Sequence, residues 1–221
     1  MALSMGFVGG TGAEGRGLAL RMALAGHRVV IGSRSEERAR QAAQEVLALA
    51  PHTTVEWASN ARAAADCAVV FLCVPYAAHR QTVAALAGPL AGKTVVDVVV
   101  PLEFRGGRPT AVPVPEGSAA RQAQSLLPDS AVVAAFHTVS ARDLLDPTRR
   151  VDTDVLVCGD EAEAKGLVME AAQAIPGVRA VDGGPLDNSR FIEGFTVLLL
   201  EVNRRYRVRA SLRLTGLRER A

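Results

Sequence analysis

The sequence has little of what marks a secreted or metal-binding protein. Its 221 residues include only three cysteines, Cys67, Cys73 and Cys158, without a CxxC spacing. A disulfide framework is therefore not expected, and a reducing compartment fits. Each cysteine lies in an apolar stretch, which favours a buried structural role over a reactive or ligand thiol. The chain also lacks HExxH, Cys/His metal spacings and GxSxG, so we expect no bound metal and no hydrolase nucleophile.

Long apolar runs and a strong net charge are missing as well. No uninterrupted apolar stretch approaches the ~18 residues that span a bilayer, and residues 1–7 lack the basic n-region of a signal peptide. The formal net charge of +2 gives no general argument for a nucleic-acid or membrane partner. Because 49% of the residues are apolar, the chain can bury a sizeable core. We expect a soluble cytoplasmic protein.

The strongest positive signal is the glycine-rich stretch 9–17. Gly10, Gly12 and Gly15 fit GxGxxG between a short apolar run and a stretch with helical spacing of apolar residues. This context predicts a dinucleotide-binding turn, with Gly10 in the tight turn, Gly12 against the pyrophosphate and Gly15 in close helix packing. The helix that begins near Ala13 would direct its free N–H groups at the phosphates. The alternative is a glycine-rich turn in another kind of α/β protein.

The second predicted strand ends in Ser33 and Arg34 where an acidic residue would be expected for NAD. An Asp or Glu at this distance from the glycines accepts hydrogen bonds from the ribose hydroxyls of NAD. Ser33, Arg34 and Arg38 offer a hydroxyl and two cations instead, which favour the 2′-phosphate of NADP. The alternative is a capping box of Ser33 and Glu36, with both arginines on a solvated helix face.

Apolar runs alternate with helical patterns along most of the chain. This alternation predicts an α/β fold, a doubly wound, Rossmann-type, mostly parallel sheet with a small C-terminal extension of helix and strand. We place a dinucleotide-binding domain at 1–136 and a smaller C-terminal domain at 137–221. The segment 102–117, rich in proline and glycine, is expected to be a long surface loop over the cleft.

Ligands of such sheets lie outside the carboxyl ends of the strands. Two predicted strands end there in Val-Pro pairs, and Val74 and Pro75 are expected beside the nicotinamide. His79, near the start of the next helix, is expected to be solvated. His137 follows another strand and is expected either to position a ligand or to be structural, ahead of a role in acid–base catalysis. Since no acid–base pair is visible, we assign no catalytic side chain.

The last part of the chain predicts a long helix over 187–206. Its apolar face, which includes Phe191, Phe195 and Leu198, suits a dimer interface or a docked core helix. Residues 208–214 alternate with a period of two and predict an edge strand. Residues 204–220 hold seven arginines and a single acidic residue, which leaves a solvated basic edge and an anion-attracting surface equally open.

These stretches together resemble the NADPH-dependent coenzyme F420 reductase family, the F420:NADP oxidoreductases. The matching motifs span nearly the whole chain: Gly9–Gly12 with Gly15 and Gly17, Gly32–Arg34 with Arg38, Val74-Pro75, Phe136–Val139, Cys158–Asp160 and Gly184–Arg190. The resemblance implies direct hydride transfer between C4 of NADPH and C5 of the deazaflavin F420, in a homodimer, without a metal or covalent intermediate.

The resemblance also implies roles for individual residues. Thr11, Gly12, Ala13 and Glu14 would surround the pyrophosphate, and Ser33, Arg34 and Arg38 the 2′-phosphate; Val74, Ala78, Val100 and Ala141 would line the nicotinamide side, with His137 and Val139 near the deazaflavin. Two alternatives remain: a related NADPH reductase acting on a flavin, ferric ion or imine, and a non-catalytic NADPH sensor.

Overall fold

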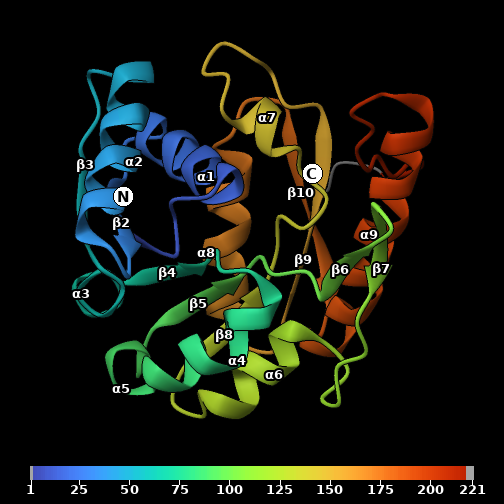
Figure 1. Ribbon diagram of the computed structural model, residues 1–221, viewed down its shortest axis with the longest axis horizontal. Coiled ribbons are helices and arrows are strands. Elements are labelled where there is room, and N and C mark those ends of the chain that lie inside the picture. Colours follow the sequence, from blue (N-terminus) through green and yellow to red (C-terminus); the bar gives the residue numbers. More distant parts are fainter. Residues whose placement is uncertain (1, 218–221) are drawn as a thin grey trace.

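An eight-stranded sheet runs through the protein, whose structure is a computed structural model that describes residues 2–217 (Figure 1). In sheet order its strands are β3 (Val55–Ser59), β2 (Arg28–Ser33), β1 (Ser4–Val8), β4 (Val69–Leu72), β5 (Thr94–Asp97), β8 (Ala131–Ala134), β9 (Thr153–Gly159) and β10 (Val178–Gly184). Every neighbouring pair is parallel except β8 and β9. The predicted mostly parallel, Rossmann-type sheet is confirmed.

Helices connect the strands and cover both faces of the sheet. They are α1 (Ala13–Leu24), α2 (Glu36–Leu49), α3 (Asn60–Asp66), α4 (Tyr76–Ala85), α5 (Ala87–Leu90), α6 (Ala119–Leu126), α7 (Ala141–Leu144), α8 (Ala162–Gln173), the 3₁₀ turn η1 (Leu186–Asn188) and α9 (Ser189–Tyr206). Buried residues of α1, α2 and α8 share one apolar cluster, and those of α3 to α6 and the start of α9 share the other. A sheet covered on both faces explains why its strands read as continuous apolar runs.

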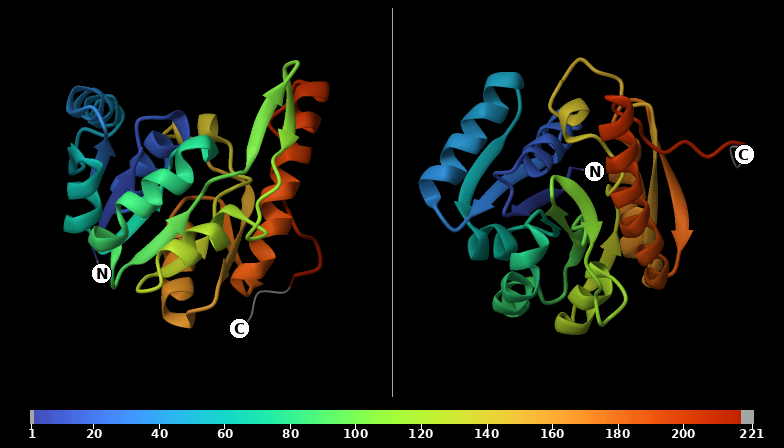
Figure 2. Two further views of the ribbon diagram at one scale, coloured as in Figure 1. Left: turned by 60° about the horizontal axis from the view of Figure 1, so that its bottom comes forward. Right: turned by 45° about the vertical axis from the view of Figure 1, so that its right-hand side comes forward.

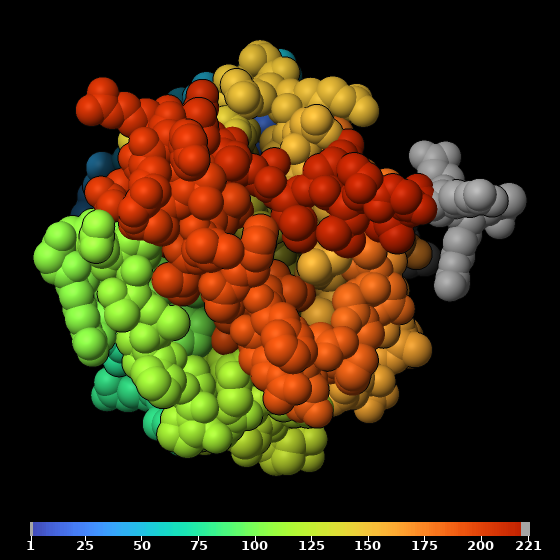
Figure 3. Space-filling model, turned by 90° about the vertical axis from the view of Figure 1, so that its right-hand side faces the viewer, coloured from blue at the N-terminus to red at the C-terminus, as the bar shows by residue number. Residues whose placement is uncertain are grey.

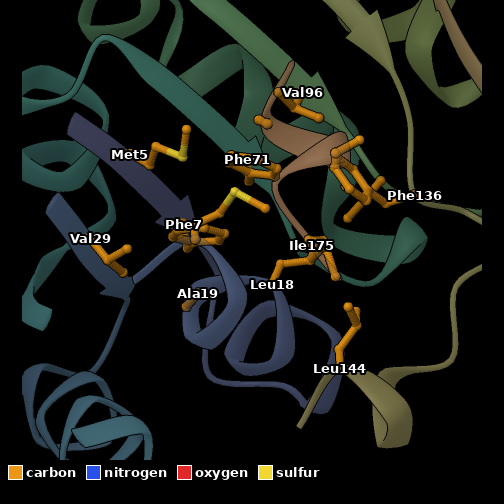
Figure 4. Close-up of a cluster of buried hydrophobic side chains, with 14 of the residues drawn as sticks. Met5, Phe7, Leu18, Ala19, Val29, Phe71, Val96, Phe136, Leu144 and Ile175 are labelled. Atoms are coloured by element: carbon orange, nitrogen blue, oxygen red, sulfur yellow. The ribbon is translucent and has the colours of Figure 1, made fainter. Parts of the chain in front are cut away.

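The first cluster centres on aromatic rings from neighbouring strands (Figure 4). Phe7 of β1 and Phe71 of β4 stack with their centroids 4.6 Å apart, and Phe136 lies 6.0 Å from Phe71. Leu18 of α1 packs in the same cluster. Burial of such large side chains stabilises the junction of β1, β4 and α1 by about 1.5–3 kcal/mol per residue, and this junction supports the glycine-rich turn.

The antiparallel strand β9 changes where the rest of the chain goes. Strand β9 runs antiparallel to β8, and β10 is parallel to β9. The carboxyl end of β10 therefore lies on the opposite side of the sheet from the carboxyl ends of β1, β4, β5 and β8. Helix α9 then runs back past the sheet beside a small hairpin, as the two views of Figure 2 show. Its later turns thereby reach the carboxyl ends of the parallel strands.

That hairpin replaces the surface loop expected over 102–117. Strands β6 (Leu102–Arg105) and β7 (Arg108–Ala111) pair antiparallel around Gly106 and Gly107, both of which have positive φ. Two consecutive residues with positive φ form the tight turn that matches the twist of a two-stranded ribbon. The Gly-Gly pair therefore directs a hairpin, and the expectation of an irregular loop was wrong for these residues.

The predicted edge strand over 208–214 was also wrong, because residues 207–217 have no regular secondary structure. Arg207 has the left-handed conformation that ends α9. The following segment is fixed by Asp154, whose carboxylate accepts hydrogen bonds from Arg179, Arg213 and the backbone N–H of Leu214. Side-chain ties to one buried carboxylate therefore take the place of a strand ladder. Within residues 2–217, no helix is long and apolar enough to cross a membrane.

Candidate functional site

Three connected cavities lie along the carboxyl ends of the parallel strands. We call them the glycine cavity, of about 650 Å³ beside the glycine-rich turn, the middle cavity, of about 370 Å³, and the α9 cavity, of about 510 Å³. Cys73, Val74 and Pro75 line both the glycine and middle cavities. Glu14, Val98, Val100 and Leu102 line both the middle and α9 cavities. The three form one continuous groove.

The turn from β1 into α1 uses its glycines for separate purposes. Gly9, with φ of +70°, makes the tight turn that the sequence assigned to Gly10. A Cβ on Gly15 would lie 2.6 Å from the Cα of Gly10, so this pair brings α1 against the turn. No other atom lies within 4 Å of where a Cβ of Gly12 would be. The turn thus leaves open space above Gly12, at the N-terminus of α1, where an anionic group is favoured.

Basic side chains line the other end of the glycine cavity. Arg34 and Arg38 are exposed, and neither forms an ion pair with any residue in the described part of the chain. Ser33 is buried, and its hydroxyl accepts a hydrogen bond from the N–H of Ser35. The cap of α2 is Ser35, so the capping box of Ser33 and Glu36 does not form. The two guanidinium groups are therefore available for an anion.

Sequence reasoning missed Asn60 in this cavity. Its side-chain oxygen accepts the N–H of Gly9 at 3.0 Å, so it fixes the glycine turn from the neighbouring crossover. Asn60 directly follows β3, and the rule that placed Val74 at the carboxyl end of a strand would have found it.

The middle cavity is walled by apolar side chains from the ends of β4 and β5 and from β6. Its lining consists of Glu14, Cys73, Val74, Pro75, Tyr76, Val98, Val99, Val100, Leu102 and Phe104. Burial raises the pKa of the Cys73 thiol well above its ordinary value, so this cysteine is a neutral wall residue. Cys67 and Cys158 are buried, as expected, and all three thiols are free.

A buried polar network supports this wall from behind, and it corrects the expectation for His79. His79 is fully buried, with Nε2 2.8 Å from Asp97 Oδ2 and Nδ1 3.1 Å from Gln122 Oε1. Asp97 also accepts the N–H of Val99. Burial lowers the pKa of His79, but the charge and hydrogen bond of Asp97 outweigh it and leave the pKa raised. His79 therefore fixes the end of β5 and does not face solvent.

The α9 cavity begins where β8 ends. Phe136 is buried with a positive φ of 68°, which is a strained conformation for a bulky residue. The next residue, His137, lines the cavity, and neither of its ring nitrogens has a hydrogen-bond partner among residues 2–217. Burial lowers its pKa to about 4, so the ring is neutral at pH 7. A neutral, unpartnered imidazole suits a ligand hydrogen bond better than a charged role.

Polar ties hold the separate walls of the α9 cavity together. Arg21 of α1 is 2% exposed, and its guanidinium donates to the carbonyls of Asp143, Leu144, Asp146 and Arg149. On the other side, the Thr196 hydroxyl of α9 lies 3.2 Å from the carbonyl oxygen of His137. These ties place α7 and α9 on either side of the residues that follow β8.

The basic C-terminal stretch is mostly neutralised by acidic residues elsewhere in the chain. Arg204 and Arg205 pair with Glu201, Arg209 pairs with Asp143, and Arg213 pairs with Asp152 and Asp154. Arg218 and Arg220 lie outside the described residues. Arg142 and Arg209 are the arginines in the lining of the α9 cavity.

The structure brings most of the predicted site residues into this groove. Thr11, Gly12, Ser33, Arg34, Arg38, Val74, Pro75 and Ala78 line the glycine cavity, Val74, Pro75, Val100 and Glu14 the middle cavity, and Glu14, Val100, His137, Val139 and Ala141 the α9 cavity. Ala13 lines none of the three, and Gly10 and Gly15 pack behind the turn. The α9 residues of the lining, Thr196, Leu199, Leu200 and Asn203, were missed, because their apolar spacing is equally typical of a docked core helix.

Comparisons with known proteins agree with this geometry. The profile of the family described as "NADP oxidoreductase coenzyme F420-dependent" matches residues 4–101. An F420-dependent NADP reductase of Methanothermobacter marburgensis is 42% identical over 98% of this chain and 100% of the relative. The chain belongs to this family. A reductase of the same name from Methanocaldococcus jannaschii is 39% identical over 97% of this chain and 99% of its own length.

A solved structure shares the whole architecture. A putative F420-dependent NADP reductase from Arthrobacter sp. FB24 superposes with a TM-score of 0.80 at 28% identity, covering 99% of this chain and all of that one. The family profile stops at residue 101, so it covers the lining of the glycine cavity and most of that of the middle cavity. The full-length relatives also align with the residues that line the α9 cavity. The likeness to these relatives therefore covers the residues of both halves of the groove.

Proposed function

We propose that the protein transfers a hydride directly between NADPH and the deazaflavin coenzyme F420. The observation that carries this proposal is the continuous groove, in which the mostly apolar middle cavity joins the basic, glycine-lined end to the α9 cavity. The middle cavity shares Cys73, Val74 and Pro75 with the first and Val98, Val100 and Leu102 with the second. Hydride transfer needs two flat rings face to face at about 3–3.5 Å in a dry site, so the protein's main contribution is positioning.

NADP(H) would bind from the glycine cavity into the middle cavity. The open space above Gly12 fits the pyrophosphate, and Ser33, Arg34 and Arg38 fit the 2′-phosphate. The nicotinamide would then lie against Val74 at the end of β4. Two guanidinium groups that form no ion pair within residues 2–217, in the same cavity as a helix N-terminus, support NADP over NAD.

F420 would bind in the α9 cavity, between the segment that follows β8 and α9. His137 offers a ring N–H and an acceptor nitrogen that have no partner within residues 2–217, while Val139 and Ala141 supply apolar walls. Arg142 is exposed at the same cavity, and we propose that it attracts the anionic phosphate and glutamate tail of F420. In this scheme the part from residue 137 onward acts as the smaller, acceptor-binding domain.

The exposed face of α9 supports a homodimer. Phe191, Phe195 and Leu198 lie at helical spacing and are 62%, 36% and 57% exposed. Figure 3 shows this face, on which α9 lies beside the hairpin. A second copy of the chain would remove this apolar stripe from water. Leu198→Glu is expected to shift the protein to monomer in sedimentation experiments, and a dimer that persists would exclude this face.

Mixing the purified protein with NADPH and F420, and following the absorbance of both, tests the activity. We expect NADPH to be oxidised only when an acceptor is present. The amount of NADPH oxidised should equal the amount of F420 reduced. Free flavin, ferric ion and an imine tested in place of F420 would reveal a related reductase, and NADPH binding without oxidation by any acceptor would indicate a sensor. The three free cysteines fit the reducing cytoplasm in which we place this reaction.

A further inference from the structure

Glu14 lies where the middle cavity meets the α9 cavity, and the transfer described above gives its carboxyl no role. It is the second residue of α1 and one of four residues that line both cavities. The other three, Val98, Val100 and Leu102, are apolar. The Oε1 atom of Glu14 is shielded from solvent and has no hydrogen-bond partner within residues 2–217. An unpartnered polar atom in a ligand cavity indicates a bond that forms with the ligand.

The surroundings of Glu14 favour its neutral form. Burial raises the pKa of this carboxyl to about 8, while the positive end of the α1 dipole acts in the opposite direction. Ionisable groups from every neighbouring wall of the two cavities face this region: Cys73 after β4, Tyr76 of α4, His137 after β8, Arg142 of α7 and Arg209 after α9. Asp97 of β5 lies behind the wall, held by His79. At pH 7 Glu14 therefore carries a proton.

Reduction of a deazaflavin by NADPH requires a proton as well as a hydride. The hydride leaves C4 of the dihydronicotinamide and bonds to C5 of the deazaflavin, whose conjugated double bonds shift so that an electron pair arrives at N1. N1 must then take up a proton. The nicotinamide is oxidised and the deazaflavin reduced, and the balance needs one H⁺ for each turnover. The sequence analysis assigned no acid, because hydride transfer to carbon needs none. Protonation of N1, however, needs a proton donor.

We propose that Glu14 is the catalytic acid of this site and donates its proton to N1 of the deazaflavin as the hydride arrives at C5. This inference rests on the proposed function. The O–H bond of Glu14 breaks, the N1–H bond forms, and the carboxylate left behind regains a proton from solvent through the groove. In the reverse direction the Glu14 carboxylate accepts the N1 proton.

The other groups that line these two cavities are poor proton donors at pH 7. Burial lowers the pKa of His137 to about 4, so its ring has already lost the acidic proton. Burial raises the pKa of Cys73 and of Tyr76 above their ordinary values. The guanidinium groups of Arg142 and Arg209 do not release protons in proteins. Glu14 alone among them is matched to the task.

The test is the pH dependence of single-turnover hydride transfer in both directions. In the wild-type protein, reduction of F420 is expected to slow above pH 8, and oxidation of reduced F420 to accelerate over the same range. Glu14→Gln keeps the size and the hydrogen-bonding capacity but cannot give up a proton. We expect it to lower the rate of F420 reduction by about 100-fold and to abolish the change near pH 8.

Glu163→Gln is the matched control. Glu163 follows an alanine as the second residue of α8, as Glu14 does in α1, but it is exposed and lies outside the lining of the three cavities. We expect this variant to keep the wild-type rate and pH profile within twofold. NADPH affinity and the thermal midpoint of Glu14→Gln, measured beside it, establish that the variant folds and binds.

A second readout needs no turnover. The pyrophosphate of NADPH would lie near Glu14 at the N-terminus of α1, and its negative charge favours the protonated carboxyl, while the reduced nicotinamide ring carries no charge. Adding NADPH without an acceptor at pH 8.5, where much of the Glu14 carboxyl is ionised, is expected to cause proton uptake and to strengthen a protonated-carboxyl band in infrared difference spectra. Both signals should be absent in Glu14→Gln and present in Glu163→Gln.

The outcomes separate this proposal from the proposed function. If the wild-type protein oxidises NADPH with F420 and Glu14→Gln retains the same rate and pH profile, Glu14 is not the acid. Equal slowing in both directions with an unchanged profile would reduce Glu14 to a positioning residue and also overturn the proposal. If the wild-type protein does not reduce F420 at all, it is the proposed function that fails.

Discussion

The glycine cavity and the α9 cavity are built in different ways. The glycine cavity takes most of its distinctive residues from two short stretches, 9–12 and 33–38, each at the start of a crossover. The α9 cavity combines residues from α1, the end of β5, the segment after β8, and α9. Buried polar ties, with Arg21 foremost, hold these distant segments in place. The proposed nucleotide site is thus encoded locally, whereas the proposed acceptor site depends on the completed fold.

The largest effect is expected from removing the tie between α1 and the α9 cavity. Arg21→Ala would leave several buried carbonyls without donors, and we expect a loss of about 3 kcal/mol in the free energy of unfolding. In protein that folds, KM for F420 should rise more than KM for NADPH. Arg28→Ala, which breaks a surface ion pair with Glu56, should cost less than about 1 kcal/mol. Equal increases of both KM values would show that the glycine cavity depends on Arg21 as much as the α9 cavity does.

The cations of the glycine cavity should affect the nucleotide alone. Arg34→Ala is expected to weaken NADPH binding by about 1.5–3 kcal/mol, the range for hydrogen bonds to charged groups, without changing the affinity for NADH. Titration calorimetry with both nucleotides measures this. Arg40→Ala serves as control, since Arg40 lies close by in the sequence, on α2, and pairs with Glu37. Equal losses for NADPH and NADH would contradict the assignment of Arg34 to the 2′-phosphate.

Acid should first loosen the segment 207–217, which Asp154 holds through Arg213 and Leu214. Burial alone would raise the pKa of Asp154, but hydrogen bonds from Arg179, Leu214 and Arg213 outweigh it and lower the pKa to about 2. A carboxyl with a depressed folded-state pKa stabilises the fold above its unfolded value of 3.8. This stabilisation, about 2 kcal/mol, is lost as the pH falls from about 4 to about 2.

Asp154→Asn should remove that dependence, as chemical denaturation at pH 5 and pH 2.5 would reveal. Asp66→Asn is the control, because Asp66 forms an exposed i,i+4 pair with Arg62. An unchanged difference between the two pH values in Asp154→Asn would mean that Asp154 does not anchor residues 207–217.

The smallest change in stability should come from Gly12→Ala. The added Cβ meets no atom of the chain within 4 Å, and φ of −74° suits alanine, so the thermal midpoint should stay at the wild-type value. The methyl group would occupy space expected for the pyrophosphate and weaken NADPH binding about tenfold, or about 1.4 kcal/mol. Gly88→Ala, in an equally open position, should alter neither quantity. Unchanged NADPH affinity in Gly12→Ala would contradict the placement of the pyrophosphate at this turn.

Sequence patterns predicted the parallel sheet and the residues at its strand ends because both depend on short-range signals. The glycine spacing and the Ser-Arg end of β2 are of this kind. His79 was assigned to solvent because its partners, Asp97 and Gln122, are 18 and 43 residues away, and no local pattern reveals them. The period of two in residues 208–214 was misleading, because residues 210–214 alternate between partly buried and exposed positions without forming a strand.

The acidic partners of the C-terminal arginines were missed for the same reason. Glu201 is close in sequence, but Asp143 and Asp154 come from other elements. Glu14 illustrates the opposite case. Its position in the glycine motif was predicted, but its burial and its lack of a partner depend on how β5 and the hairpin close over α1.

The reversed strand β9 has a consequence for how such reductases diversify. Because the chain returns along α9 only after the crossovers that build the glycine cavity are complete, we expect changes in that last helix to alter the α9 cavity while leaving the glycine cavity intact. Evolution, or an engineer, would then redirect electrons to a new recipient by rewriting a single late segment of the gene, the one that encodes α9.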